Sequence, residues 1–162
     1  MPPKITFTTG DATAPAGDGN KVIAHICNDR GGWGAGFVLA LSRRWREPEA
    51  DYRAWYAGRE TNDFELGATR LVPVSANLWV ANMVAQHGTR AKGGLPPIRY
   101  DAVEACLRSL AGHASDLRAS IHMPRIGCGL AGGRWEEIEP LVQRCLLDAG
   151  VAVTVYDFAS SK

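Results

Sequence analysis

The sequence lacks the features that mark several large classes of protein. It contains no block of basic residues and its net charge is only +1, which argues against broad electrostatic binding to nucleic acid. No apolar run is long enough to cross a bilayer, and the start, MPPKITFTTG, lacks the apolar segment of a signal peptide. The four cysteines form neither a CxxC pair nor a Cys/His metal motif. We therefore expect a reduced, cytoplasmic protein that needs no metal or cofactor.

The chain also has no internal repeat, low-complexity tract or linker, so we expect one domain over residues 1–162. Short apolar runs alternate with helical patterns, which predicts helices on both faces of one sheet. The expected strands are 4–9, 21–27, 68–74, 78–85, 120–123 and 151–156, and the expected helices are 37–45, 48–58, 100–117 and 135–149. A turn at 75–77 joins two of these strands as a hairpin, so the sheet should be mixed.

Two glycine-rich stretches each follow an expected strand and lead into a helix. They are NDRGGWGAG at 28–36 and MPRIGCGLAGGR at 123–134. Glycine lets the backbone approach a ligand closely, and N–H groups at a helix start attract phosphate. Loops of this kind lie at the carboxyl ends of strands in an α/β sheet. If strands 21–27 and 120–123 are neighbours, the loops face each other across one crevice that suits a diphosphate.

Other candidate site residues are individually ambiguous. Asp11, after the first strand, fits either an acceptor for an adenine amino group or a turn residue, and Phe158 fits either a ring stacked on a base or a core-edge aromatic. Trp33 fits either a lid over a ligand or a tryptophan packed on the surface. Cys128 fits either a thiol whose pKa is lowered by a helix start or a small side chain in a tight turn. His87, in the loop after a strand, is the histidine most suited to chemistry.

Three classes of function follow from these residues. The first is a hydrolase that acts on a nucleotide diphosphate compound, and the second is a module that binds such a compound without catalysis. The third is a dehydrogenase that uses Gly127, Gly129 and Gly132 as G-x-G-x-x-G, with Asp157 as the ribose ligand. The dehydrogenase is disfavoured for two reasons. The G-x-G-x-x-G motif usually lies at the start of its domain, and a dehydrogenase would give no role to the glycine-rich stretch 28–36.

Four stretches, ITFTTGDAT, HICNDRGGWGAGF, MPRIGCGLAGGRW and TVYDF, together resemble the macrodomain family over nearly the whole chain. The resemblance is to the branch of the terminal ADP-ribose protein glycohydrolase and the ALC1-like macrodomains. It implies a three-layer α/β/α fold with a mixed sheet of about six strands, and ADP-ribose in the crevice. The implied binding residues are Asp11 and Ala12 at the adenine, Asn28 at the distal ribose, Gly34, Ala35, Gly36, Arg125, Ile126, Gly127, Cys128, Gly129, Leu130 and Ala131 around the diphosphate, and Tyr156 and Phe158 beside the adenine. Trp33, within the first loop, is a further candidate for contact with the ligand.

The glycohydrolase resemblance also calls for a catalytic lysine after the fourth strand and an aspartate after GCGL. Here those positions hold Gln86 and Ala131, which supply neither a nucleophilic amine nor a carboxylate. We therefore expect either binding alone or attack by a water oriented by the substrate phosphate or by Asn28, Gln86 or His87.

The resemblance favours a hydrolase that releases mono-ADP-ribose from modified targets, with glutamate or aspartate esters first and DNA adducts second. A non-catalytic ADP-ribose reader, an ADP-ribose-1″-phosphate phosphatase and an O-acetyl-ADP-ribose deacetylase are the alternatives. The expected partners are ADP-ribose and mono-ADP-ribosylated protein, with ADP-ribosylated DNA as the alternative target and no membrane, and the expected state is a monomer.

Overall fold

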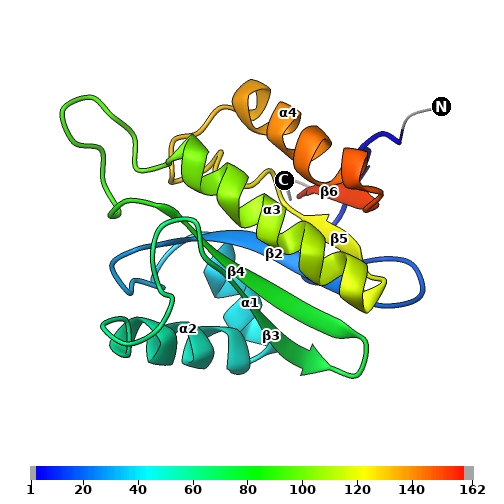
Figure 1. Cartoon of the computed structure of the whole chain (residues 1–162), viewed down its shortest axis with the longest axis horizontal. Helices are drawn as coiled ribbons and strands as arrows, with labels where there is room; N and C mark the ends of the chain where they lie inside the picture. The colour runs from blue at the N-terminus through cyan, green and yellow to red at the C-terminus, as the bar shows by residue number, and fades with distance from the viewer. Residues whose placement is uncertain (1–2, 159–162) are drawn as a thin grey trace.

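A computed structural model describes residues 3–158 and places six strands in one mixed sheet (Figure 1). The strands are β1 (Thr6–Thr9), β2 (Lys21–Asn28), β3 (Thr69–Ser75), β4 (Leu78–Gln86), β5 (Ser120–Met123) and β6 (Val153–Asp157). Their order across the sheet is β1-β6-β5-β2-β4-β3. Neighbours are parallel except for the hairpin β3–β4. Five strands therefore end at the same edge of the sheet, as the sequence predicts.

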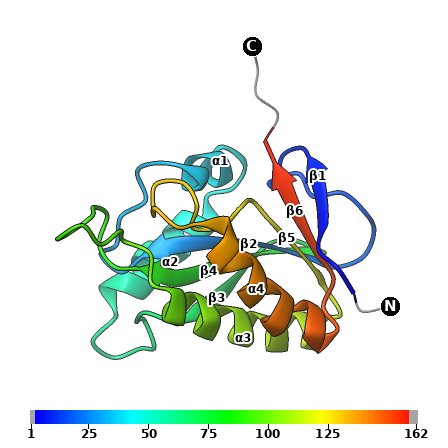
Figure 2. The same ribbon diagram turned by 90° about the horizontal axis from the view of Figure 1, so that it is seen from above.

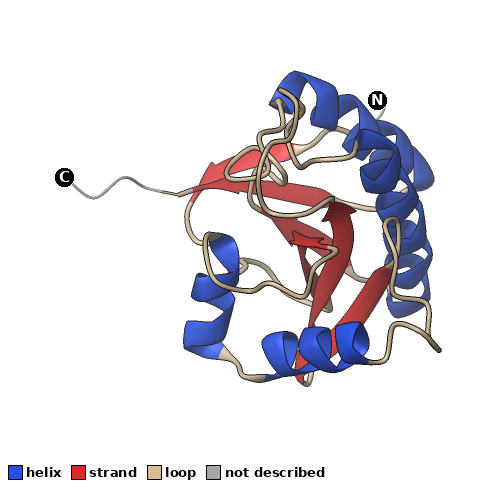
Figure 3. Cartoon of the chain, turned by 90° about the vertical axis from the view of Figure 1, so that its left-hand side faces the viewer, coloured by secondary structure: helices blue, strands red, loops and turns tan. Residues whose placement is uncertain are grey.

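The helices form a layer on each face of this sheet (Figure 3). They are α1 (Phe37–Arg44), α2 (Glu47–Ala57), α3 (Tyr100–Leu117), α4 (Trp135–Cys145) and a short 3₁₀ turn (Leu147–Ala149). Residues of α3 and α4 form the apolar core on one face, and residues of α1 and α2 form the core on the other. The three-layer α/β/α fold is confirmed. Among the helices of residues 3–158, none combines the length and apolarity needed to cross a bilayer.

Burial along the strands explains why the central ones read as continuous apolar runs. Strands β2 and β4 are buried on both faces along most of their length, as expected of central strands covered by helices on both sides. The edge strand β1 is exposed throughout. It begins at Thr6 rather than at Lys4 because Thr6 is the first of its residues to pair with β6, opposite Thr154.

The ends of two helices differ in how well the sequence predicts them. Helix α2 begins at Glu47, one residue before the expected Pro48, and Pro48 is tolerated in its first turn because a proline there forfeits no intrahelical hydrogen bond. The expectation of one helix to Ala149 is wrong, since α4 ends at Cys145 and the chain tightens into a 3₁₀ turn. That turn buries both Leu146 and Leu147 and ends at Gly150 in the left-handed conformation.

Candidate functional site

The two glycine-rich loops flank one cleft at the carboxyl edge of the sheet. Strands β2 and β5 are parallel neighbours, with Val22 opposite Ile121, so the loops that follow them lie side by side. A cavity of about 290 Å³ is lined by residues 35–38 of the first loop and helix, and by residues 124–127 and 129–131 of the second. The predicted crevice between the two loops is therefore confirmed.

Both walls of this cavity present backbone amides without partners. The amides of Gly129, Leu130 and Ala131 donate to no acceptor within residues 3–158, and neither do those of Gly36 and Phe37 on the opposite wall. Helix α1 begins at Phe37, so its positive end faces the cavity. Helix α4 begins only at Trp135, and none of its residues lines the cavity. The expected alignment of an amide-lined loop with a helix start therefore holds for the first loop and is wrong for the second.

The glycines of the second loop serve different purposes. Gly127 has φ +73°, and a Cβ there would lie 2.3 Å from Ile98 Cδ1. A Cβ on Gly133 would lie 2.5 Å from the Gly127 carbonyl oxygen. These two glycines are required by the fold itself. At Gly129, by contrast, a Cβ would meet nothing within 4 Å, so its missing side chain keeps the cleft open.

A second cavity of about 400 Å³ continues the cleft past the first loop. The two cavities share the side chains of Ile26, Ala35, Val38, Gln86 and Leu130. Trp33 lies in the wall of the second cavity and is only 4% exposed, with its Nε1 donating to Ser42 Oγ at 2.8 Å. Trp33 is therefore a fixed part of the wall and not a lid.

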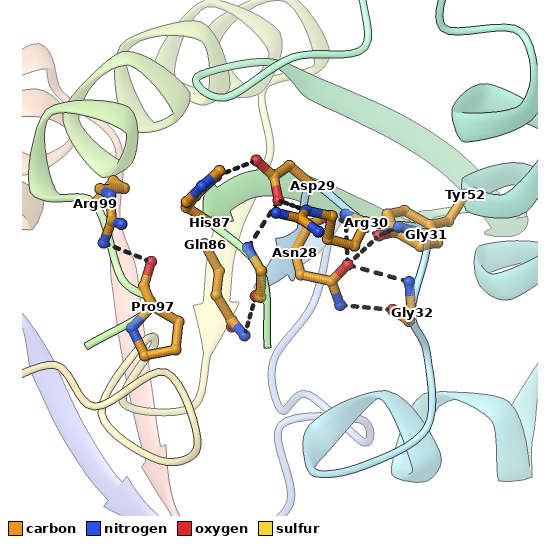
Figure 4. A network of polar contacts seen from close by, with 11 residues as sticks. Asn28, Asp29, Arg30, Gly31, Gly32, Tyr52, Gln86, His87, Pro97 and Arg99 are labelled. Carbon is orange, nitrogen blue, oxygen red and sulfur yellow. Dashed lines mark hydrogen bonds and ion pairs between the residues drawn. The ribbon is translucent and has the colours of Figure 1, made fainter. Parts of the chain in front are cut away.

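Asn28 holds the first loop in shape (Figure 4). Its side-chain oxygen accepts hydrogen bonds from the amides of Arg30 (2.8 Å) and Gly32 (3.1 Å), and its Nδ2 donates to the Gly32 carbonyl (2.9 Å). The buried Tyr52 hydroxyl donates to the Asn28 carbonyl at 2.6 Å and accepts from the Gly31 amide at 3.1 Å. One Nδ2 hydrogen of Asn28 is left over, and Asn28 lines the second cavity.

Gln86 and His87 are neighbours in sequence, but their side chains point in different directions (Figure 4). Gln86 lines both cavities of the cleft, and its Nε2 donates to the Gly88 carbonyl at 3.0 Å. His87 instead lies 2.7 Å from Asp29, through Nδ1 and Oδ2, and lines a separate cavity. Asp29 also accepts from the Gly88 amide at 2.8 Å, so this cluster fastens the loop after β4 to the loop after β2.

The residues expected at the adenine differ in how far their side chains are buried. The Asp11 carboxylate accepts from the amide and the hydroxyl of Thr13. Burial favours its protonated form, but these bonds and Arg44 outweigh burial, so the pKa of Asp11 lies below its usual value. Ala12 is buried beside it. Tyr156 is buried and its hydroxyl bonds to His122 and the Ala16 amide, whereas Phe158 is 76% exposed.

Two features of the cleft escape sequence reasoning. The first is an ion pair in which Arg125 donates to both oxygens of Asp157, at 2.6 and 3.0 Å, while its guanidinium lies against Phe7 and Trp135. The hydrogen bond and charge of Arg125 lower the pKa of Asp157. Asp157 is thus engaged with Arg125 rather than held ready as a ribose ligand. Only the order of the strands, which places β6 beside β5, reveals this pair.

The second feature is His25, which lies within β2. It lines the cleft, is 2% exposed and has no hydrogen-bond partner for Nδ1 within the described residues. Asn82 donates to the Pro48 carbonyl at 3.1 Å and turns its oxygen toward His25 Nε2. With the amide assigned in that orientation, Nε2 carries the proton and Nδ1 is a free acceptor. Burial lowers the pKa of His25 to about 4.

Cys128 does not behave as an activated thiol. Its pKa is raised by burial, and the nearby charge of Arg125 only partly counters this. The thiol lies 3.5 Å from the Ile126 carbonyl and does not line the cleft. The hypothesis of a lowered pKa at a helix start is therefore wrong, and Cys128 is a small side chain in a tight turn.

No family model matches this chain. A macrodomain protein of Streptomyces coelicolor is 52% identical, over 96% of this chain and 100% of that one, with a TM-score of 0.87. Chromodomain-helicase-DNA-binding protein 1-like of Mus musculus is 34% identical over 98% of this chain, which spans only 18% of that protein's length. The structure of Thermosipho africanus DarTG in complex with ADP-ribose is 18% identical, over 87% of this chain and 38% of that one, and shares the fold with a TM-score of 0.64. The sheet order and the antiparallel β3 do not fit the dinucleotide-binding fold of a dehydrogenase. Because it is 52% identical to a macrodomain protein over nearly the whole of both chains, the chain belongs to the macrodomain family.

Proposed function

We propose that the cleft binds ADP-ribose and that the protein hydrolyses mono-ADP-ribose from modified targets, with glutamate and aspartate esters as the first candidates. The observation that carries this proposal is the set of unpartnered amides on both walls of the first cavity. Such amides, together with the positive end of α1, suit the negative charges of a diphosphate.

The shape of the cleft supports a ligand that extends from a central diphosphate. The two cavities, of about 290 and 400 Å³, share five side chains and so form one elongated space. The diphosphate would lie against Gly129, Leu130 and Ala131, with the distal ribose in the second cavity near Asn28. Arg125, which lines the first cavity, would lie beside the diphosphate, and Asp11 would lie toward the adenine. The Thermosipho protein of the same fold binds ADP-ribose.

Catalysis would depend on a positioned water, because Gln86 and Ala131 stand where a lysine and an aspartate are expected. The water oxygen would attack C1″ of the distal ribose as the bond from C1″ to the ester oxygen breaks. The leaving carboxylate takes that electron pair, and the water releases its proton to solvent or to the carboxylate. Gln86 is suited to hold this water, because its Oε1 accepts no hydrogen bond within the described residues and it lines both cavities.

The other two candidate catalytic residues take supporting roles in this scheme. Asn28 shapes the first loop and offers its remaining amide hydrogen to the distal ribose. His87 acts through Asp29 to hold the loop that carries Gln86.

A release assay tests the proposal. A protein mono-ADP-ribosylated on glutamate is mixed with the wild type, with Gly129→Glu and with Gly112→Glu, and loss of the label is followed. Gly129→Glu should abolish release, because the side chain enters the cleft without a clash and repels the diphosphate. Gly112 lies exposed in α3, away from the cleft, and its Cβ would also meet nothing within 4 Å, so Gly112→Glu should leave release unchanged.

A second variant tests the role of Gln86. Gln86→Ala should lower kcat by about 10- to 100-fold with little change in affinity for ADP-ribose. Binding of ADP-ribose without any release by the wild type would make the protein a reader. Full activity in Gln86→Ala would remove this side chain from the mechanism.

A further inference from the structure

A third cavity, of about 280 Å³, lies beside the cleft, and half of its eight lining residues are arginine or lysine. The loop between β4 and α3 forms most of its wall and projects at the side of the molecule away from β1 and β6 (Figures 1 and 2). We call it the cationic cavity, and its charged lining residues are Arg30, Arg90, Lys92 and Arg99, with His87 beside them.

The positive charge of this cavity is largely uncompensated. Within residues 3–158 its lining residues pair with one carboxylate, that of Asp29, which is already bonded to His87 and the Gly88 amide and lies 3.7 Å from Arg30. Arg90 and Lys92 form no ion pair within residues 3–158. Clustered cations without counter-charges repel one another, and an anionic ligand reduces this repulsion.

The cationic cavity adjoins the second cavity of the cleft. Thr89 lines both the cationic cavity and the second cavity of the cleft. Asn28, which the proposed function places at the distal ribose, is followed directly by Asp29 and Arg30. A group attached to C1″ of that ribose would therefore leave the cleft toward Arg90 and Lys92.

We infer that the cationic cavity binds carboxylate side chains that flank the modified residue, so that the preferred target is an acidic stretch of protein. This inference rests on the proposed function, which places the ester in the second cavity. A discrete cavity suits one or two carboxylates held by forked Arg and mobile Lys donors. A nucleic-acid strand would instead require a track of cations along the surface, and the chain has a net charge of only +1.

Two peptides mono-ADP-ribosylated on the same glutamate test the inference. In one the flanking residues are aspartate and glutamate, and in the other they are asparagine and glutamine. Their affinities are measured by competition against labelled ADP-ribose, and their hydrolysis is measured separately. The acidic peptide should bind about three- to tenfold more tightly to the wild type. That preference should vanish at about 1 M salt, where the charges are screened.

The double variant Arg90→Gln/Lys92→Gln should bind both peptides equally, with unaltered affinity for free ADP-ribose. A charge-matched control, Lys4→Gln/Arg43→Gln, alters two exposed cations that line neither the cleft nor the cationic cavity, and it should keep the preference.

Equal affinity of the wild type for both peptides would overturn the inference. The inference would also be overturned if an ADP-ribosylated oligonucleotide bound more tightly than the acidic peptide and if that binding depended on Arg90 and Lys92. Binding of both peptides without hydrolysis would refute the proposed hydrolase, while the affinity ratio would still decide the inference.

Discussion

Gly127 and Gly129 lie two residues apart in one loop, yet alanine should have opposite effects at the two positions. At Gly127 the backbone is left-handed, with φ +73°, which costs an alanine about 1–2 kcal/mol. The new Cβ would also lie 2.3 Å from Ile98 Cδ1 and 3.2 Å from methyl groups of Ile138 and Ile26, and such overpacking costs about 1–3 kcal/mol. Gly127→Ala should therefore reduce the free energy of unfolding by about 2–5 kcal/mol.

Gly129→Ala should leave stability unchanged or raise it by up to about 1 kcal/mol, because its Cβ meets no atom and the unfolded chain loses freedom. It should weaken ADP-ribose binding instead, since the added methyl narrows the cleft.

Urea and thermal unfolding of the two variants and of Gly112→Ala provide the measurement, with calorimetric titration of ADP-ribose beside them. In a chain of this size 1 kcal/mol moves Tm by about 2–4 °C, so Gly127→Ala should melt about 5–15 °C lower. Gly112→Ala, at an exposed position of helix α3, should gain about 1 kcal/mol and shows that the assay resolves small changes. An unchanged Tm for Gly127→Ala, or a destabilised Gly129→Ala with normal binding, would refute the division of roles between the two glycines.

Three further outcomes follow from single groups in and under the cleft. Tyr52→Phe should cost about 1–2 kcal/mol in urea unfolding and raise the Kd for ADP-ribose, because the Asn28 carbonyl and the Gly31 amide lose their hydroxyl partner. Since burial lowers the pKa of His25 from its ordinary 6.5 to about 4, the unfolded chain binds the proton more tightly. Stability should therefore fall as pH decreases from about 7 to 4.5, by up to about 3 kcal/mol from this group, and the fall should be smaller in His25→Asn. A thiol reagent should modify at most Cys128 in the native protein, since Cys27, Cys106 and Cys145 are buried and free; rapid reaction of all the thiols would contradict the packing.

The sequence predicts the fold well where local patterns suffice. Strand 120–123 and the hairpin at 75–77 are found as expected, because apolar runs bounded by turn residues mark them without reference to the rest of the chain. The crevice between the two loops depends on one assumption, that β2 and β5 are neighbours, and the sheet order bears it out. The end of α4 is mispredicted because helical spacing continues through Leu146 and Leu147, which a 3₁₀ turn buries equally well.

The chemistry of the cleft is less accessible from the sequence, because its polar contacts join residues far apart in the chain. Arg125 and Asp157 are 32 residues apart, and His87 and Asp29 are 58 apart. Neither pair has a local signature. The free Nδ1 of His25 is still less predictable, because it depends on the orientation of the Asn82 amide. The roles of Asp11, Tyr156 and Phe158 at the adenine remain predictions.

The loops on both sides of the cleft are held by contacts within the chain, so the cleft is formed before any ligand binds. Asn28 and Tyr52 fix the first loop, Asp29 fastens the loop after β4 to it, and Gly127 and Gly133 pack the second loop against Ile98. A site that must reorganise around its ligand spends binding energy on ordering, whereas a preformed one directs that energy to the reacting bond. Because Gln86 and Ala131 offer neither a nucleophile nor a base, the proposed hydrolysis would depend mainly on the positioning of substrate and water. The rigidity of its loops is therefore the property on which the proposed activity most depends.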